Sequence, residues 1–366
     1  MNHKSKRVMM LVTLAVSGAL SLSACSGGGS TPGTGSDTAG EVPSWCGHKQ
    51  ISLAMLDGFG GNAWRQIAAK SGRQEAAKCP SVKSFEYSDA QGDTQKAISD
   101  IKAMVATGVN AMVVFPDAGE AVLPALRSAY KAGVVTVPYR TDPGGKNGID
   151  YNVWIGSDFV DHGVTWGQWI KEKFPNGAKI LDIGGPAGNS QGLAQKQGLK
   201  SVLTDAKYEW IGTQPFEVTD WDPAKTQQVL TAAIARYDHI DVIVGEYGAS
   251  LVGALPRFPA SGRSIPAVLT EDGHAIACFF NKNKDANPDF NLVTVGTGVD
   301  NVRLAIQHAV AIATGGKEPA ETVYATGLFE DSTSKDHPVQ CDPSLPADIH
   351  LSAQLTGKEQ AAIVGG

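Results

Sequence analysis

Polar and aromatic side chains recur directly after short apolar runs along this chain. Ile51–Leu56, for example, leads into Asp57, and Val134–Val137 leads into Arg140. Carboxylates and guanidinium groups form strong, directional hydrogen bonds with hydroxyls, and aromatic rings cover C–H surfaces. This combination is the chemistry that carbohydrate recognition requires. The candidate binding residues chosen on this basis are Asp57, Asn62, Trp64, Arg65, Asp93, Arg140, Asn189, Trp221, Tyr247, Asp272 and Thr297.

Each of these residues also has a plain structural interpretation. Asp93 has the position of a helix N-cap, and Trp64 that of a core residue at a helix start. Arg140 is equally suited to a salt bridge between two halves of the fold, and Tyr247 to buried packing. The recurrence of such residues after successive strands favours binding.

The elements that must position these residues alternate between strands and amphipathic helices from Ile51 onward. Such alternation predicts right-handed βαβ units and an α/β fold with two doubly wound parallel sheets. The pattern breaks at 142–155, and the helix expected at 299–314 returns to the first half. We therefore expect an N-terminal lobe of residues 45–150 plus 299–325 and a C-terminal lobe of 151–298 plus 326–366. Ligands of such folds lie beyond the carboxyl ends of the strands, which predicts a site in the cleft between the lobes.

Within the second half, the individual elements are also predicted by their apolar spacing. We expect a strand at 210–213 and one helix at 250–258.

The N-terminus has the pattern of a bacterial export signal. Residues 1–24 combine a basic start with a short apolar run. Leu22-Ser23-Ala24-Cys25 has the form of a lipobox, which predicts acylation of Cys25, and residues 25–44 form a Gly/Ser-rich tether. The alternative is an ordinary cleaved secretory signal. Either interpretation places the protein outside the cytoplasm, and the lipobox predicts a lipid-anchored protein on the outer face of the membrane, periplasmic or at the cell surface.

The bulk composition excludes several classes of protein. Hydrophobic residues make up 42% and charged residues 19%, with a net charge of −6, which argues for a globular chain and against a nucleic-acid partner. Four cysteines remain besides Cys25, and we favour the pairs Cys46–Cys79 and Cys278–Cys341, because each pair then lies within one lobe. The alternative is four free thiols. We expect no metal, since the sequence has no Cys-x-x-Cys or His-x-x-x-His spacing, and no cofactor, since Gly184–Gly188 lacks the dinucleotide-binding fingerprint.

The chain resembles the ribose/galactose type of solute-binding proteins, the type 1 periplasmic binding proteins that serve bacterial sugar ABC importers. The resemblance covers about Gln50 to Thr326 and depends on the order of several short segments. They are Asn62-x-Trp64-Arg65, Pro138-Tyr139-Arg140, Ile155-Gly156-Ser157-Asp158, Gly188-Asn189-Ser190 with Gly198, Asp220-Trp221-Asp222 and Thr270-Glu271-Asp272-Gly273.

The resemblance implies a role for each matching residue. Asn62, Arg65, Arg140 and Asp272 would hydrogen-bond sugar hydroxyls, and Trp64 and Trp221 would sandwich the ring. Further contacts would come from Asp93, Gln195, Tyr247 and Thr297. The chain departs from the family pattern at Tyr139, Gln195 and Glu246-Tyr247, which leaves the ligand's identity open, and its tail after Thr326 is longer than the family's.

The function that follows is capture of a neutral monosaccharide or sugar alcohol, closure of the lobes, and delivery to membrane-bound ABC permease subunits. We expect a monomer without catalytic activity. The alternatives are a sugar-sensing module that presents its ligand to a membrane signalling protein and a secreted carbohydrate-active enzyme.

Overall fold

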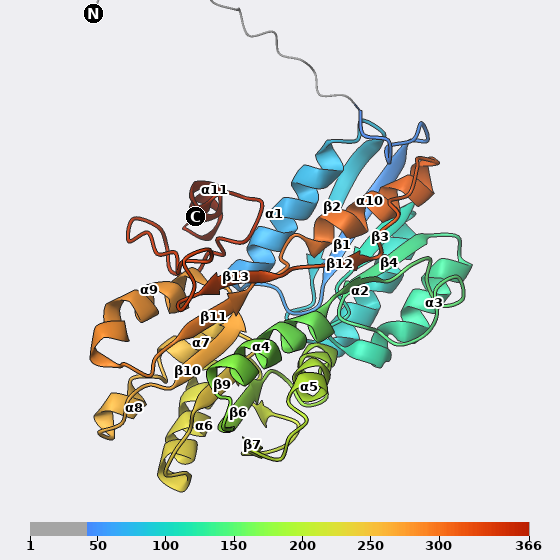
Figure 1. The fold of residues 1–366 in the computed structure, drawn as a ribbon. Coiled ribbons are helices and arrows are strands. Elements are labelled where there is room, and N and C mark those ends of the chain that lie inside the picture. Colours follow the sequence, from blue (N-terminus) through green and yellow to red (C-terminus); the bar gives the residue numbers. More distant parts are fainter. Residues whose placement is uncertain (1–41, 366) are drawn as a thin grey trace, which may run out of the picture. The chain divides into compact units, whose positions relative to one another are not determined.

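The computed structural model describes residues 42–365, in which two β-sheets each carry helices on both faces (Figure 1). In the first sheet the strands run, in spatial order, β12 (Val323–Tyr324), β5 (Ile155–Ser157), β4 (Val135–Arg140), β3 (Ala111–Val114), β1 (Ile51–Asp57) and β2 (Val82–Asp89). All pairings in this sheet are parallel. Its helices are α1 (Ala63–Ala77), α2 (Thr94–Thr107), α3 (Leu123–Lys131) and α10 (Asn301–Thr314), with a short 3-10 helix, η1 (Gly119–Val122), before α3. This sheet and these helices are the N-terminal lobe.

The second sheet and its helices form the C-terminal lobe. Its strands run in the order β13 (Leu328–Asp331), β11 (Leu292–Val295), β10 (Ala267–Glu271), β9 (Val242–Gly245), β6 (Ala178–Gly184) and β7 (Tyr208–Ile211), with β8 (Glu217–Val218) also paired to β6. Among the described strands β13 alone pairs antiparallel, with β11. Its helices are α4 (Phe159–Lys173), α5 (Ser190–Val202), α6 (Pro223–Arg236), α7 (Gly248–Val252), α8 (Arg257–Ala260) and α9 (His274–Asn283), followed by η2 (Lys284–Ala286). The predicted fold class, two parallel-sheet α/β lobes, is confirmed.

Alternating residues of the central strands explain why each sheet is covered on both faces. Leu53 and Met55 pack with α1 and α10, whereas Ala54 and Leu56 pack with α2 and α3. Successive side chains of a strand point to opposite faces, so a continuous apolar run predicts a sheet buried between two helix layers. In the C-terminal lobe, α4 and α5 lie on one face of the sheet and α6 to α9 contribute to the core on the other.

The chain passes between the lobes after β5, after β11 and between β12 and β13. The predicted boundary at residue 150/151 needs a correction, because β5 pairs with β4 and so belongs to the N-terminal lobe. β5 is only three residues long, and such a short segment gives no periodic signal in the sequence.

Two elements of the C-terminal lobe differ from their predicted bounds. The strand expected at 210–213 is β7, which starts at Tyr208 and ends before Gly212, whose φ of 83° is left-handed. The single helix expected at 250–258 is divided into α7 and α8. Gly253 follows α7 and Pro256 precedes α8, and neither residue favours a continuous helix.

The tail after β13 contacts both lobes, which corrects its expected assignment to the C-terminal lobe alone. Its first part is joined to α9 by the disulfide between Cys278 and Cys341. Its last part contains α11 (Gly357–Val364), which packs against α1, and Leu355 is buried in the core of the N-terminal lobe. Figure 1 shows α11 beside α1.

Both predicted disulfides, Cys46–Cys79 and Cys278–Cys341, are present. Cys46–Cys79 lies near the start of the described chain. Within residues 42–365, every helix is too short or too polar to span a bilayer. The predicted signal peptide, the acylation site Cys25 and most of the tether lie outside the described residues.

Candidate functional site

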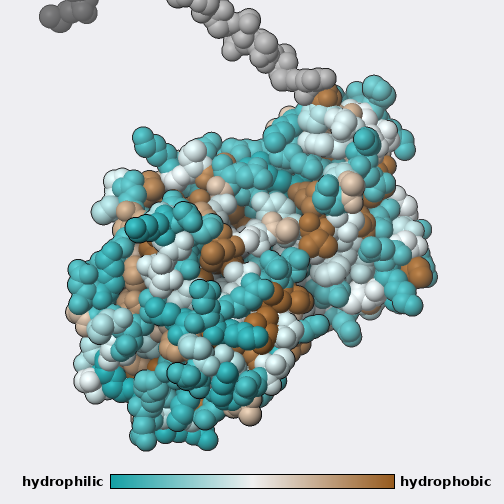
Figure 2. Space-filling model, in the orientation of Figure 1, coloured by the Kyte–Doolittle hydropathy of each residue, from teal (hydrophilic) through white to brown (hydrophobic). Residues whose placement is uncertain are grey.

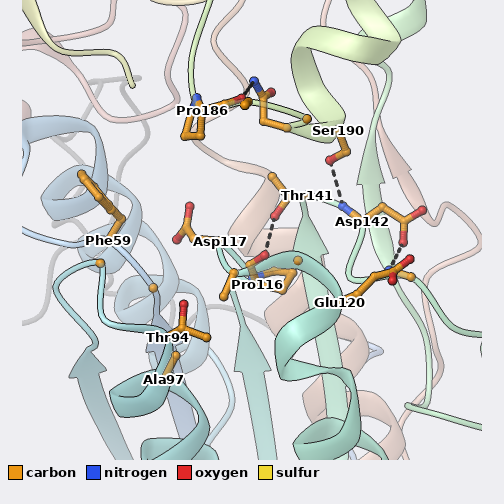
Figure 3. Close-up of a pocket in the computed structure, with 18 of the residues that line it drawn as sticks. Phe59, Thr94, Ala97, Pro116, Asp117, Glu120, Thr141, Asp142, Pro186 and Ser190 are labelled. Atoms are coloured by element: carbon orange, nitrogen blue, oxygen red, sulfur yellow. Dashed lines mark hydrogen bonds between the residues drawn. The ribbon is translucent and has the colours of Figure 1, made fainter. Parts of the chain in front are cut away.

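A cavity of about 600 Å³ lies between the lobes where the carboxyl ends of both sheets meet. Figure 3 shows residues of the N-terminal lobe, such as Phe59 and Asp117, facing Pro186 and Ser190 of the C-terminal lobe. Strand-end loops and the first turns of α2 and α5 supply the lining, as expected for α/β sheets. The residues lining this inter-lobe cavity are Gly58, Phe59, Gly92, Asp93, Thr94, Ala97, Pro116, Asp117, Ala118, Gly119, Glu120, Thr141, Asp142, Gly144, Pro186, Ala187, Gly188, Asn189, Ser190, Leu193 and Trp221.

Three of the predicted binding residues line this cavity: Asp93, Asn189 and Trp221. Asp93 also caps α2, accepting hydrogen bonds from the backbone of Gln95 and Lys96. Asn189 caps α5 through the Gly192 amide. Capping and cavity lining are therefore compatible at these positions, because the helix N-termini point at the cavity.

The Trp221 indole is held in a fixed orientation on the C-terminal lobe. Asp220 and Trp221 have left-handed φ values of 53° and 55°, uncommon for such residues. The indole lies against the backbone of Gly185, where a Cβ would overlap the ring. Its Nε1 donates to Glu246 Oε2 at 3.0 Å. A half-buried indole anchored in this way provides a rigid aromatic wall.

Glu246 is the buried carboxylate behind this wall. It also accepts a hydrogen bond from Asn189 Nδ2 at 3.2 Å. Burial raises the pKa of Glu246 to about 7, because desolvation disfavours the charged form and the hydrogen bonds from Asn189 and Trp221 only partly offset it. Its side chain thus joins the loop after β9, the cap of α5 and the aromatic wall.

Asp57 and Arg65 lie behind the cavity in a buried ionic group. Arg65 contacts Asp57 at 3.0 Å and Asp117 at 2.7 Å, and its guanidinium lies 3.5 Å from the ring centroid of Phe115. Burial raises the pKa of Asp117 to about 6 despite the neighbouring Arg65 charge. Asp117 therefore connects the cavity wall to the interior.

Arg140 links the two lobes. Its left-handed φ of 65° directs the side chain across the cleft, where it donates to Thr297 O at 2.8 Å and Glu271 Oε2 at 3.1 Å. It also donates to Gln191 Oε1 at 3.3 Å. The salt bridge between the halves of the fold that the sequence offered as an alternative is present.

Glu271 and His162 share this buried environment. Burial raises the pKa of Glu271 to about 7, an effect that Arg140 opposes. Burial, followed by the Arg140 charge, lowers the pKa of His162 to about 3, so its imidazole is neutral. The neutral His162 therefore adds no second positive charge beside Arg140.

Hydrogen bonds within the protein also occupy the polar groups of Trp64, Thr297 and Asp272. Trp64 Nε1 donates to Thr297 Oγ1 at 2.9 Å, and the Thr297 amide donates to Asp272 Oδ1 at 3.0 Å. Ser352 of the tail donates to the same Asp272 oxygen at 2.6 Å. These residues lie together with Arg140 at the inner end of the cleft.

The remaining predicted residues lie apart from the cavity lining. Asn62 is exposed and caps α1, and Tyr247 is half-buried before α7. Gln195 is buried within α5, and its Nε2 has no hydrogen-bond partner among the described residues.

Several lining residues were missed by sequence reasoning, notably Phe59, Glu120, Asp142 and Leu193. Phe59 and Leu193 are large hydrophobic residues that are 46% and 44% exposed. Phe59 follows the first strand, and Leu193 lies in the first turn of the helix after β6. Their positions after strand ends could therefore have identified them as lining residues from the sequence. Figure 2 shows that hydrophobic residues on one face of the molecule gather in a band across its middle.

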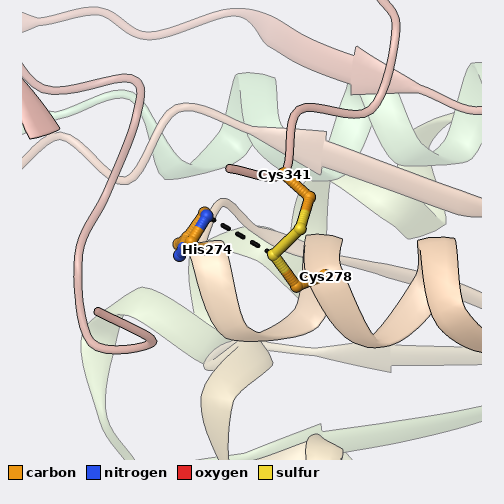
Figure 4. A group of neighbouring side chains, drawn as sticks. All are labelled: His274, Cys278 and Cys341. Carbon is orange, nitrogen blue, oxygen red and sulfur yellow. Dashed lines mark hydrogen bonds between the residues drawn. A yellow bond between two sulfur atoms is a disulfide. The ribbon is translucent and has the colours of Figure 1, made fainter. Parts of the chain in front are cut away.

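Three neighbouring side chains of the kinds that bind metals lie away from the cavity: His274, Cys278 and Cys341 (Figure 4). The two sulfur atoms are joined in the disulfide. His274 Nδ1 lies 2.7 Å from Pro346 O, and Nε2 accepts from the Asp342 amide at 3.0 Å. These atoms hold the tail against α9.

Comparison with known proteins decides the family. Residues 54–326 match the model of the periplasmic binding protein domain. The chain belongs to this family. Among curated relatives, the ribose import binding protein of Bacillus subtilis is 26% identical over 222 residues, or 60% of this chain. The match spans 66% of that relative, less than two thirds of its length.

Solved structures of this periplasmic binding protein fold agree with the two-lobed architecture. The Caulobacter myo-inositol binding protein bound to myo-inositol has a TM-score of 0.66 and 20% identity, covering 76% of this chain and 92% of its own. The fructose binding periplasmic domain of a hybrid two-component system has a TM-score of 0.66 and 18% identity, covering 78% and 92%. At this level of identity the likeness establishes the fold.

Proposed function

We propose that this periplasmic binding protein is the extracytoplasmic solute-binding component of an ABC importer and captures a neutral polyhydroxy ligand between its lobes. The observation that carries the proposal is the inter-lobe cavity at the carboxyl ends of both sheets. Its lining combines carboxylates, such as Asp93 and Glu120, with the anchored indole of Trp221. The names of the relatives, a ribose import binding protein and a myo-inositol binding protein, support a ligand of this class.

The proposed mechanism is closure of the lobes around the ligand. Arg140 donates to Glu271, and the Asp142 amide donates to Ser190 Oγ at 3.3 Å, so direct contacts also span the cleft. A ligand that touches both lobes adds to these contacts and shifts the population toward the closed form. The permease subunits would then recognise the closed form.

Ligand binding is tested by thermal shift and calorimetry with a panel of pentoses, hexoses, alditols and disaccharides, because a ligand that binds the folded state raises its stability. Trp221→Phe should weaken binding, since it removes indole area and the hydrogen bond to Glu246. Trp210→Phe is the matched control, because Trp210 lies on β7 outside the cavity lining. Equal affinity in both variants, or a panel without any binder, would count against the proposal.

We extend the proposal to a monomer that binds without catalysis. Support comes from the names of the relatives, which are binding proteins. The expected results are a monomeric mass in solution and recovery of bound ligand chemically unchanged. A hydrolysed or oxidised ligand would indicate an enzyme.

A lipid anchor at Cys25 is a separate part of the proposal. The lipobox and the Gly/Ser-rich segment after it support an anchor on the outer face of the cell membrane. Cys25→Ala should release the protein into the soluble fraction after export. Retention in the membrane would refute the anchor.

A sensing role is the second candidate, because the fructose binding neighbour belongs to a hybrid two-component system. Deleting the gene should abolish uptake of the ligand if the importer proposal holds. Normal uptake combined with loss of a transcriptional response would favour sensing.

A further inference from the structure

The inner end of the cleft is occupied by the protein's own side chains. Trp64, Arg65, Arg140 and Thr297 are between 2% and 8% exposed. Their polar groups are bonded to Asp57, Asp117, Glu271 and one another. A sugar ring that bound there would have to replace buried charge-assisted hydrogen bonds, which are costly to break.

The open space lies farther out, between Asp117 and the two rims of the cleft. A cavity of about 600 Å³ lies well within the range of about 300–1,000 Å³ that holds drug-sized ligands, which are larger than one hexose ring. One ring would leave much of this volume to solvent. Well-fitted ligands are mostly buried by their pockets, so the volume favours a longer molecule.

The lining determines the chemistry of that molecule. Four carboxylates, those of Asp93, Asp117, Glu120 and Asp142, line the cavity, and the lining among the described residues includes no lysine or arginine. Such a lining accepts hydrogen bonds from hydroxyls and repels an anion.

Apolar side chains stand on both rims of the cavity. Phe59 of the N-terminal lobe and Leu193 of the C-terminal lobe are large, exposed and part of the lining, and Trp221 lies on the same lobe as Leu193. Phe59 and Leu193 provide surfaces for the C–H faces of a second ring.

We infer that the inter-lobe cavity takes a carbohydrate of about two rings without a negative charge, a disaccharide or comparable glycoside, rather than a single monosaccharide. The inference rests on the proposed carbohydrate-binding function and specifies the length and charge of its ligand. The inner ring lies against Asp117 and Trp221, and the outer ring lies between Phe59 and Leu193.

The test offers the purified protein an equimolar mixture of sugars. The mixture contains glucose, galactose, xylose, ribose, myo-inositol, maltose, cellobiose, lactose, melibiose and glucuronic acid. After desalting, native mass spectrometry gives the mass of the retained ligand, and calorimetry compares each retained sugar with its constituent monosaccharides. We expect a two-ring mass and an affinity at least about tenfold above that of either constituent.

The outcomes separate this inference from the function on which it rests. Retention of a monosaccharide, or equal affinity for one ring and two, overturns the inference and leaves the carbohydrate-binding function intact. Retention of glucuronic acid in preference to neutral sugars overturns the charge assignment. If no carbohydrate is retained, the proposed function fails, and the inference fails with it.

A pair of variants tests where the second ring lies. Leu193→Trp fills the outer part of the cavity from α5, and we expect it to weaken disaccharide binding by about tenfold or more. Val160→Trp is the control, because Val160 is also exposed on the C-terminal lobe and is not part of the lining. Both variants replace exposed residues, and circular dichroism verifies folding. Wild-type affinity in Leu193→Trp would overturn the outer position.

Discussion

Replacing Glu246 by Gln should change how the free energy of unfolding depends on pH. Glu246 is 4% exposed and has hydrogen bonds from Trp221 and Asn189 but no salt bridge among the described residues. Burial raises its pKa from an ordinary value of 4.5 to about 7. The folded state therefore retains a proton that the unfolded state releases as the pH rises above 4.5.

The size of the effect follows from linkage between proton binding and folding. Where the folded state binds more protons than the unfolded state, stability falls as the pH rises. Each tenfold difference in proton affinity is worth about 1.4 kcal/mol, so a pKa of about 7 instead of 4.5 corresponds to about 3 kcal/mol. This contribution is lost between pH 4.5 and 7 and stays lost above pH 7.

Glu246→Gln removes the titrating group and keeps its shape. The variant carries a pH-independent cost, because its amide nitrogen faces donor groups, but it lacks the loss between pH 4.5 and 7. The free energy of unfolding of the variant minus that of the wild type should therefore rise by up to about 3 kcal/mol from pH 4.5 to pH 7.5. Taking the difference removes other buried acids, such as Glu271, from the comparison.

Urea denaturation at pH 4.5, 5.5, 6.5 and 7.5 measures this difference. Glu209→Gln is the control, since Glu209 is exposed on β7, and its curve should run parallel to that of the wild type. A difference between Glu246→Gln and wild type that stays constant across this range would refute the reasoning, because Glu246 would then titrate alike in both states.

Three further predictions concern other contacts. Gly185→Ala should weaken ligand binding by about tenfold in calorimetry, because a Cβ would overlap the Trp221 indole that forms the cavity wall. Arg140→Ala should lower the free energy of unfolding by about 3–5 kcal/mol in urea at pH 8, because Glu271 loses its buried partner. Cys341→Ser should lower it by about 2–4 kcal/mol, since the disulfide closes a separation of 63 residues.

Control variants and contrary results test these predictions. Gly253→Ala adds a Cβ that meets no atom within 4 Å, so it should leave binding unchanged; normal binding in Gly185→Ala would contradict the role of the indole. Lys225→Ala breaks an exposed ion pair with Asp220 and should leave stability unchanged, in contrast to Arg140→Ala. Wild-type stability of Cys341→Ser would show that other contacts hold the tail.

The periodic parts of the fold were predictable because their signal is local. The helix expected at 299–314 is present as α10, which covers Asn301–Thr314. Short strands such as β5 and β12 have no such signal, since their register is set by a partner far along the chain. The position of the tail after β13 could not be predicted either, because it also depends on a contact with a distant part of the chain. Leu355 is buried only because it packs in the same core as α1.

The sequence by itself determined the two-lobed α/β architecture and the placement of polar side chains at strand ends, because periodicity and chain order specify these features. It favoured the cysteine pairing that the structure shows but left free thiols as an alternative. Only the tertiary structure decided which strand-end residues face the cavity and which bind one another. Arg140 and Glu271 are 131 positions apart and become a buried pair only when the lobes meet. Whether a polar side chain remains available to a ligand depends on such long-range partners, and local sequence patterns carry no information about them.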